Sequence, residues 1–258
     1  MSRAPDRDQI FIASGGASPG PRSRILALVA VRDEMRYLPG FLSNVGPQVD
    51  GIIALDDGSS DGSANCLASH PAVEELLRVP GDRPRWDEVG NHRALISTAL
   101  RHSAEWVICL DADHRVERDF RARCETVIDR GHPLGIEAYA LPLRELWDSP
   151  RRYRVDGVWG SKLRARLFRV REDHRFDTRP YHGVKAPLQA WRNGKLPIAD
   201  LEVYHLRMIR REDRMARRRR YEAADPEERF QPGIGYAYLT DESGLRLEEV
   251  PRDRDYVE

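Results

Sequence analysis

Two pairs of aspartates follow apolar segments that have the composition of buried strands. Asp56 and Asp57 follow GIIAL, and Asp111 and Asp113 follow WVICL. Ligands of open α/β sheets bind beyond the carboxyl ends of the strands, so we expect both pairs to face one crevice. Two carboxylates about 4 Å apart in a cleft repel by several kcal/mol, and a divalent cation removes that repulsion. Aspartate oxygens favour Mg²⁺ or Mn²⁺, either of which would bridge to a diphosphate.

Each pair also has an ordinary structural interpretation. The residues DDGSSD, Asp56 to Asp61, are typical of a turn. Asp111 has a residue type that caps helices. One pair alone therefore leaves the choice between turn and metal site open. The presence of both pairs in order is the more specific signal.

The aspartates need a scaffold, and the sequence predicts alternating strands and helices around them. The aliphatic run Ile25 to Val31 is typical of a strand buried on both faces. A helix over 34–44 and a strand over 52–55 complete a βαβ unit. Further strands are expected at 76–79, 106–110, 136–147, 163–168 and 198–205. Further helices are expected at 90–103, at 118–130 with Gly131 as its cap, and after Leu206.

This order predicts an α/β fold class: a Rossmann-like, mostly parallel central sheet flanked by helices, with a mixed second half. Residues 1–23 form a loose polar leader, 24–225 one domain and 226–258 a C-terminal extension. The leader lacks the charged and apolar regions of a signal peptide. No apolar run approaches the roughly 20 residues that span a bilayer. We expect a cytoplasmic protein, and peripheral contact with the cytoplasmic face of a membrane stays open.

Composition narrows the functional classes further. The chain has 258 residues, 42 basic and 42 acidic, with a formal net charge of zero, so global charge does not indicate nucleic acid. The basic segment ARRRRY, 216–221, has no interleaved aromatic residues of the kind that bind nucleic acid. The hydrophobic fraction of 40% can fill a core. The three cysteines, Cys66, Cys109 and Cys124, form no paired short spacing, which favours a reducing compartment.

The aspartate segments resemble a known family in matching order. ILALVAVRDEMRYLPGFLSNVGPQVDGIIALDDGSSDGS resembles the opening of family 2 glycosyltransferases of the GT-A fold, and EWVICLDADHRV resembles their metal-binding Asp-x-Asp motif. The resemblance covers Ile25 to Val116 well and extends more weakly to about Tyr221. It implies a metal-dependent, inverting hexosyltransferase that uses a nucleotide-diphosphate sugar, with a UDP-sugar as first choice. The acceptor hydroxyl would belong to a glycan such as a cell-envelope polysaccharide, a glycolipid or a small molecule.

The resemblance also implies roles for individual residues. The nucleotide-sugar-binding residues would be Arg32, Glu34, Asp56, Asp57, Ser59, Arg93 and Asp111. The metal, Mn²⁺ or Mg²⁺, would be held by Asp111 and Asp113, with His205 of VYHL completing the metal or diphosphate site. Two alternatives stay open. Arg93 has the features of a surface helix residue, and His205 shares a strand face with Leu201 and Val203, as a core histidine would.

The general base is the point at which the sequence departs from the family. Relatives carry His-Glu after a late strand, whereas here Gly183 follows His182. His182, Asp156 and Asp177 are the alternative base candidates for removing the acceptor proton. Loss of the glutamate leaves open a non-catalytic sugar-nucleotide-binding protein. A nucleotidyltransferase is disfavoured, because no Gly-rich phosphate loop follows Val31.

Overall fold

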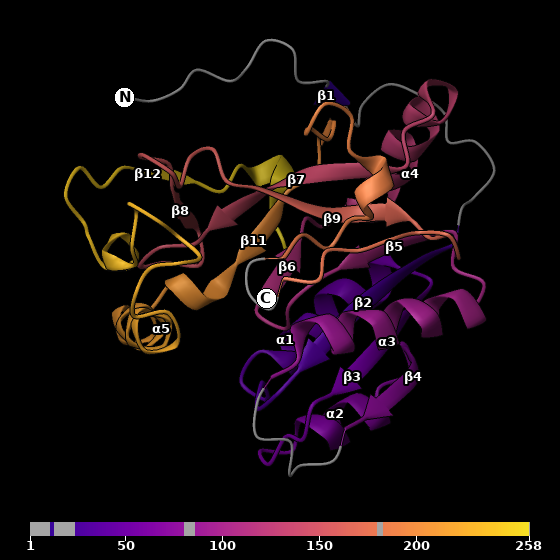
Figure 1. Ribbon diagram of the computed structural model, residues 1–258, viewed down its shortest axis with the longest axis horizontal. Helices are drawn as coiled ribbons and strands as arrows, with labels where there is room; N and C mark the ends of the chain where they lie inside the picture. Colours follow the sequence, from indigo (N-terminus) through magenta and orange to yellow (C-terminus); the bar gives the residue numbers. More distant parts are fainter. Residues whose placement is uncertain (1–10, 13–23, 80–85, 180–182, 258) are drawn as a thin grey trace.

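A central mostly parallel sheet with helices on both faces organises the chain (Figure 1). A computed structural model describes residues 11–12, 24–79, 86–179 and 183–257. The strand order across the sheet is β1-β10-β7-β9-β5-β2-β3-β4. These strands are β1 (Phe11–Ile12), β2 (Ile25–Val31), β3 (Gly51–Asp56), β4 (Val73–Arg78), β5 (Trp106–Cys109), β7 (Ala138–Glu145), β9 (Leu163–Arg169) and β10 (Ile198–Ala199).

Two pairs of short strands extend this framework. β11 (Val203–His205) pairs with β7 in parallel and with β6 (His114–Val116) in antiparallel orientation. β8 (Arg152–Arg154) and β12 (Leu247–Glu249) form a separate antiparallel ribbon. The helices are α1 (Leu38–Val45), α2 (Ser63–Ser69), α3 (Glu88–Arg101), α4 (Phe120–Gly131) and α5 (Arg211–Ala224).

The parallel half of the sheet forms from the apolar runs that are buried on both faces. β2 pairs in parallel with β3 and β5, and β3 pairs in parallel with β4. β9 runs antiparallel between β5 and β7, so the second half is mixed. The predicted fold class is therefore confirmed. A parallel arrangement also brings the carboxyl ends of β2, β3 and β5 to one edge.

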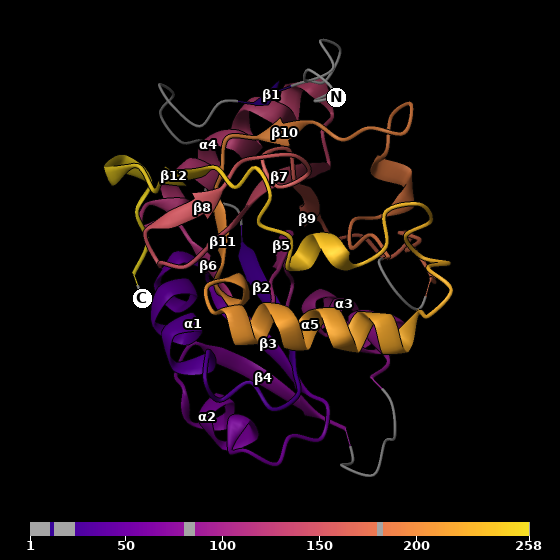
Figure 2. The ribbon, with the colours of Figure 1, turned by 90° about the vertical axis from the view of Figure 1, so that its left-hand side faces the viewer.

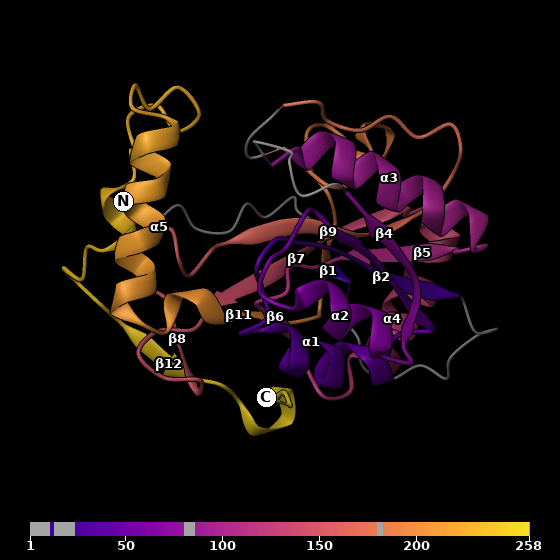
Figure 3. The same cartoon turned by 90° about the horizontal axis from the view of Figure 1, so that it is seen from below.

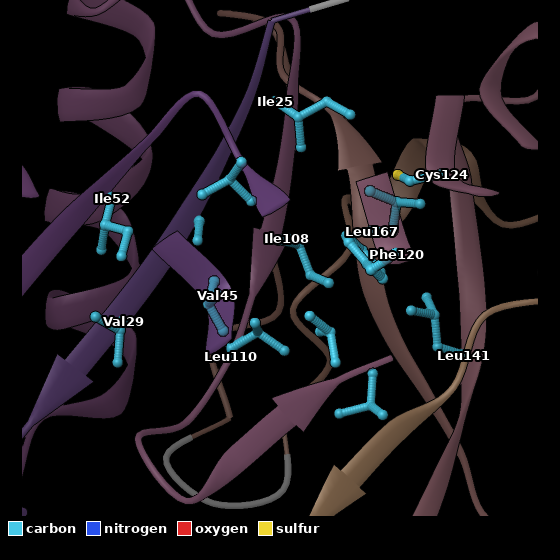
Figure 4. Packing of buried hydrophobic residues seen from close by; sticks show 14 of the residues in the cluster. Ile25, Val29, Val45, Ile52, Ile108, Leu110, Phe120, Cys124, Leu141 and Leu167 are labelled. Carbon is cyan, nitrogen blue, oxygen red and sulfur yellow. The ribbon is translucent and has the colours of Figure 1, made fainter. Parts of the chain in front are cut away.

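Each face of the sheet has its own hydrophobic cluster, and different helices pack on each. On one face the side chains of α1, α2 and α4 pack against residues such as Ile25, Val29 and Ile108 (Figure 4). On the other face Leu95, Ile96 and Ala99 of α3 are buried, as their helical spacing predicts. Figure 3 shows α3 on the opposite side of the sheet from α1, α2 and α4.

Several predicted element boundaries move for local reasons. α1 begins at Leu38 rather than at Glu34, with Pro39 in its first turn, where the missing N–H costs nothing. The strand predicted over 198–205 divides into β10 and β11. Gly131 is the last residue of α4 rather than its cap, and the left-handed residue is Gly135, with φ 63°, after a 3₁₀ turn. The sequence did not predict β6, β8 or β12, which have three residues each.

The C-terminal residues pack around two tryptophans beside β8 and α5. Trp147 and Trp159 are buried with Tyr236 and Leu239, and β12 joins β8 in the same region (Figure 2). The guanidinium carbon of Arg214 lies 4.1 Å from the centroid of the Trp147 ring. Residues of the predicted extension 226–258 thus contribute to a cluster with residues of 24–225. Among the described residues no helix is long and apolar enough to cross a membrane.

Candidate functional site

Both aspartate pairs lie at the carboxyl edge of the parallel strands. Asp56 ends β3 and is paired in register with Val31, the last residue of β2. Asp111 and Asp113 follow β5, the other neighbour of β2. Asp56, Asp57 and Asp113 are buried, whereas the side chain of Asp111 is 56% exposed. The sheet order therefore places both acidic segments next to the end of β2, as the sequence predicts.

Asp113 is the most heavily contacted acidic group of this edge. Its Oδ2 accepts a hydrogen bond from Nε of Arg207 and lies 3.2 Å from Nε2 of His205. Its Oδ1 is buried and has no hydrogen-bond partner among the described residues. Burial opposes ionisation, but His205, Arg207 and His114 together hold the pKa of Asp113 well below its ordinary value. Asp113 is thus a carboxylate with one oxygen available to a ligand.

His205 is held in place by Glu145. The register of β11 with β7 sets His205 opposite Glu145, and Nδ1 of His205 contacts the Glu145 carboxylate. Nε2 then points toward Asp113 and lies 3.2 Å from Nη1 of Arg217. Burial disfavours the imidazolium, but Glu145 and Asp113 outweigh it and raise the pKa of His205. A carboxylate on one ring nitrogen is the usual way in which proteins orient a histidine toward a metal.

His114 lies beside the same aspartates with a different hydrogen-bonding role. Its Nδ1 accepts from the backbone N–H of Asp111 at 3.1 Å. Burial lowers the pKa of His114 to about 3, so the ring is neutral and its proton is on Nε2. Nε2 lies 3.5 Å from Asp111 Oδ2 and 3.9 Å from Asp113 Oδ1. Asp113, His114 and His205 place ligand atoms within 4.8 Å of one another. The proton on Nε2 of His114 makes Asp113 and His205 the candidate metal ligands of this group.

Asp111 is paired with Arg166 of β9. Nη2 of Arg166 donates to Asp111 Oδ2 at 2.9 Å, and Nη1 donates to the carbonyl of Cys109 at 3.0 Å. The register of β7 with β9 shifts at this point, so that Arg166 has no partner of its own on β7. Such a bulge redirects a side chain. Although the side chain of Asp111 is half-exposed, partial desolvation opposes its ionisation, but Arg166 and His114 outweigh this and lower its pKa.

The loops after β2 and β3 are tied together and reach the same centre. Arg32 donates from Nε to the carbonyl of Asp57 at 2.6 Å, and Ser59 donates its N–H to Asp56 Oδ2 at 3.2 Å. Glu34 accepts from Nη2 of Arg207, the guanidinium that also contacts Asp113. Asp56 Oδ1 is buried without a hydrogen-bond partner among the described residues. The predicted residues Arg32, Glu34 and Asp56 thus lie along one continuous edge.

A cavity of about 160 Å³ opens between α3 and the ends of β2 and β5. Its polar lining residues are Glu88, Asn91, His92, Asp111, Arg166 and Lys185, and Trp86 adds an aromatic wall. Burial lowers the pKa of His92 to about 3, so this ring is neutral. Arg93 points away and is exposed, whereas its neighbours Asn91 and His92 line the cavity. The helix therefore faces this cavity through residues other than Arg93.

Two of the three candidate bases, Asp156 and Asp177, are engaged by neighbouring arginines. Asp156 accepts from Nε and Nη2 of Arg154 and from the N–H of Arg246. Asp177 accepts from Arg179, which lowers its pKa to about 2. His182 lies outside the described residues. The two aspartates are therefore held in ion pairs of their own.

Sequence reasoning missed several charged residues that converge on this edge. Arg166, Arg207 and Glu145 gave no signal, because their contacts depend on strand register. Asp213 and Arg217 have the i, i+4 spacing of a helical ion pair, but Asp213 pairs with Arg36 and Arg217 contacts His205. The strand over 163–168 was predicted and is β9, and the alternation of basic residues at 162, 164 and 166 is the signal that could have indicated its basic face.

Comparison with known proteins gives relatives in sequence and in fold. No family model matches the chain. It is 30% identical over 220 residues to the uncharacterized protein Rv3786c of Mycobacterium tuberculosis, covering 83% of this chain and 53% of that protein, and equally to a Mycobacterium bovis protein. The chain is also 30% identical over 160 residues to a TPR repeat-containing protein of Synechococcus elongatus. This match covers 62% of this chain and 35% of that protein. The chain thus spans about half the length of the first of these relatives.

The fold is also found among solved structures. TarS of S. aureus aligns with a TM-score of 0.50 at 13% identity, covering 81% of this chain and 41% of TarS. A TarS fragment, residues 1–349, has been solved in complex with UDP and aligns over 47% of this chain and 35% of that fragment at 13% identity, with a TM-score of 0.38. The likeness to full TarS shows that this chain has a GT-A-like glycosyltransferase fold.

Proposed function

We propose that this protein is a metal-dependent, inverting glycosyltransferase that moves a sugar from a nucleotide-diphosphate donor to an acceptor hydroxyl. One observation carries the proposal. Asp113 presents a buried oxygen without a hydrogen-bond partner among the described residues, next to Nε2 of His205, at the carboxyl edge of a GT-A-like sheet. This is the edge at which open α/β sheets bind their ligands.

The donor atoms of the site fit a divalent cation. Asp113 and His205 would hold the ion, and the half-exposed carboxylate of Asp111 is the next oxygen available. A set that mixes carboxylate oxygen with imidazole nitrogen favours Mn²⁺ over Mg²⁺, because Mg²⁺ rarely takes nitrogen ligands from proteins. The ion would supply Lewis-acid stabilisation of the negative charge that develops on a leaving diphosphate.

The chain's own cations support the same task. Arg166, Arg207 and Arg217 have guanidinium groups that contact Asp111, Asp113 and His205 respectively. Arginine forks bind phosphate oxygens with two parallel hydrogen bonds, so these side chains are suited to hold a diphosphate. Fixed cations at the leaving group lower the barrier without reorganising during the reaction.

The nucleoside would lie along the edge from Asp56 to the cavity below α3. Asp56 offers a buried oxygen acceptor without a partner among the described residues, which suits a base N–H or a ribose hydroxyl. Arg32, Glu34, Asp57 and Ser59 belong to the loops that shape this stretch. A UDP-sugar is the first donor to test. The ion pairs of Asp156 and Asp177 keep these carboxylates ionised but occupied. We propose His182 as the base from its residue type alone, since it lies outside the described residues.

Isothermal calorimetry with UDP, GDP and dTDP, each with and without Mn²⁺, tests the proposal. We expect micromolar-class binding of one nucleotide, about −8 kcal/mol, that requires Mn²⁺. Asp113→Asn should abolish the metal-dependent part, whereas Asp173→Asn, at an exposed aspartate paired with Arg171, should leave it unchanged. Thermal unfolding of both variants checks the fold. Absence of nucleotide binding under every condition would reject a glycosyltransferase, and binding without turnover of any donor sugar would indicate a non-catalytic binding protein.

A further inference from the structure

A second cavity lies beside the start of β9, where its residue Arg164 is two positions along the strand from Arg166 of the cavity below α3. It has a volume of about 410 Å³. One wall comes from the start of β9 and the residues before it, and the other from the segment after α5. The lining residues are Val158, Ser161, Lys162, Leu163, Arg164, Gln231, Ile234 and Tyr238. No residue of this set lines the cavity below α3.

The cavity contains a cation that has no carboxylate partner. Arg164 donates from Nη1 to the carbonyl of Leu163 at 2.9 Å, and within the described part of the chain it forms no ion pair. Its neighbours differ, since Lys162 pairs with Glu145 and Arg166 pairs with Asp111. Basic residues thus stand at three alternate positions, Lys162 just before β9 and Arg164 and Arg166 within it, and among the described residues Arg164 is the one of these three without an ion pair.

The electrostatic surroundings of Arg164 favour such an anion. Although solvent reaches its side chain, partial desolvation lowers the pKa of Arg164, and the positive charges of Arg166 and Arg217 lower it further. Glu145 acts in the opposite direction but is already bound to Lys162 and His205. A guanidinium crowded by other cations gains most from a ligand that carries a negative charge.

The rest of the cavity presents apolar and aromatic surface. Val158 is 52% exposed and Ile234 is 61% exposed, and both line the cavity. The ring of Tyr238 lies 5.3 Å from that of Trp159, centroid to centroid. Exposed apolar side chains beside fixed polar groups are typical of small-molecule sites. A suitable ligand therefore carries an anionic group next to an apolar or ring surface.

We propose that this cavity is the acceptor subsite and that it selects acceptors bearing a carboxylate or a phosphate, which Arg164 binds. The identification of the ligand as the acceptor rests on the proposed function. The cavity is joined to the metal site by a short chain of contacts, because Lys162 binds Glu145, Glu145 binds His205 and His205 contacts Asp113. A ligand held at Arg164 would thus lie beside the residues that position the metal site, in a cavity that shares no lining residue with the cavity below α3.

Ligand-observed NMR and calorimetry with phenyl phosphate and phenylacetate test the anion site, with phenyl glucoside as the neutral probe. Each probe is titrated into the wild-type chain, Arg164→Gln and Arg169→Gln, with and without UDP and Mn²⁺. Arg169 is the matched control, because it belongs to the same strand and lines neither cavity. UDP binding in the presence of Mn²⁺ is measured on the same three proteins.

We expect at least one anionic probe to bind the wild type more tightly than the neutral probe, and to bind while UDP and Mn²⁺ are present. Arg164→Gln should weaken binding of the anionic probe about tenfold or more, roughly 1.4 kcal/mol. Arg169→Gln should bind the probe as the wild type does, and all three proteins should bind UDP with the same affinity. Unchanged probe affinity in Arg164→Gln, or no binding of either anion, would overturn the proposal. Displacement of the anion by UDP, with weaker UDP binding in Arg164→Gln, would assign Arg164 to the donor's diphosphate instead. Anion binding without any nucleotide binding would reject the proposed function but retain the anion site.

Discussion

At the scale of single residues, the acidic centre is already neutralised by the chain's own cations. Asp113 contacts Arg207 and His205, Asp111 contacts Arg166, and Glu145 contacts Lys162 and His205. Because isolated buried charges cost several kcal/mol each, such pairing stabilises the folded chain before any ion binds. A divalent ion at Asp113 would therefore compete with a guanidinium for the same carboxylate.

This competition predicts the effect of Arg207→Gln on metal affinity. Removal of one positive charge beside Asp113 should tighten binding of Mn²⁺ alone by about tenfold, since a unit charge in this range changes the interaction by 1 kcal/mol or more. Calorimetric titration of Mn²⁺ into the nucleotide-free protein measures it. Arg36→Gln is the control, because Arg36 pairs with Asp213 rather than with Asp113. Weaker Mn²⁺ binding in Arg207→Gln would mean that the guanidinium holds the site in shape rather than competing with the ion.

Glu117 predicts a measurable pH dependence of stability. This carboxyl is buried and accepts from Arg254 at 2.8 Å and from the N–H of Glu202 at 3.0 Å, with Arg123 3.4 Å away. Burial nevertheless raises its pKa from 4.5 to about 7. A raised carboxyl pKa means that the folded chain holds the proton more tightly than the unfolded chain. Protonated Glu117 therefore makes its full contribution to the stability of the folded chain below pH 4.5. This contribution is lost as the pH rises to about 7.

Glu117→Gln removes this titration. The unfolding free energy of the variant relative to wild type should rise by about 3 kcal/mol between roughly pH 5 and pH 8. Denaturant unfolding at a series of pH values measures the difference, with Glu137→Gln, at a partly exposed glutamate paired with Arg171, as the control. A difference that does not change with pH would show that Arg254 and Arg123 keep Glu117 ionised.

Single-sequence reasoning reached the residues whose chemistry is local in the chain. Asp56, Asp111 and Asp113 were placed correctly at strand ends, because the apolar runs before them predict strands. The family resemblance implied a role for His205, and the structure places this residue beside Asp113. The remaining members of the site could not be predicted in this way. Arg166 depends on a register shift in β9, and Glu145 on the parallel pairing of β7 with β11.

At the scale of elements, the short strand β11 connects the two halves of the site. It pairs with β7, which carries Glu145, and with β6, which directly follows Asp113. β11 has only three residues, which is too short for a sequence pattern to define its ends. A single strand over 198–205 was therefore predicted in place of β10 and β11. β2 was predicted with its observed bounds, because a buried parallel strand requires a continuous apolar run. The length of the run thus decides which strands can be predicted.

The last residues of the chain stabilise this connection. The ring of Tyr256 stacks on that of Tyr204 in β11, with centroids 4.9 Å apart, and its hydroxyl donates to the carbonyl of Pro150. Tyr256→Ala should reduce the free energy of unfolding by about 3 kcal/mol, because it removes a buried ring and leaves a cavity. Val257→Ala, at a side chain that is 39% exposed, should change it by less than about 0.5 kcal/mol. Denaturant unfolding of the two variants and the wild type measures these differences. Equal stabilities of the two variants would show that Tyr256 does not stabilise β11.

At the scale of the whole molecule, one sheet edge joins features from distant parts of the sequence. The proposed nucleoside side is built from β2, β3 and α3, and the proposed metal side from Asp113 after β5, Glu145 of β7 and His205 of β11. The segment after α5 adds the second cavity, so the described C-terminal residues contribute to binding surface as well as to stability. A formally neutral chain thereby concentrates its cations where a diphosphate and an anionic acceptor would lie.

A crystal structure with UDP and Mn²⁺, with anomalous scattering recorded at the manganese edge, tests the central claim most directly. We expect one anomalous peak within about 2.5 Å of Asp113 and His205, with the UDP diphosphate on its other side and the nucleoside toward Asp56. A nucleotide bound elsewhere, or a peak that lacks Asp113 among its ligands, would contradict a metal-dependent donor site at this edge of the sheet.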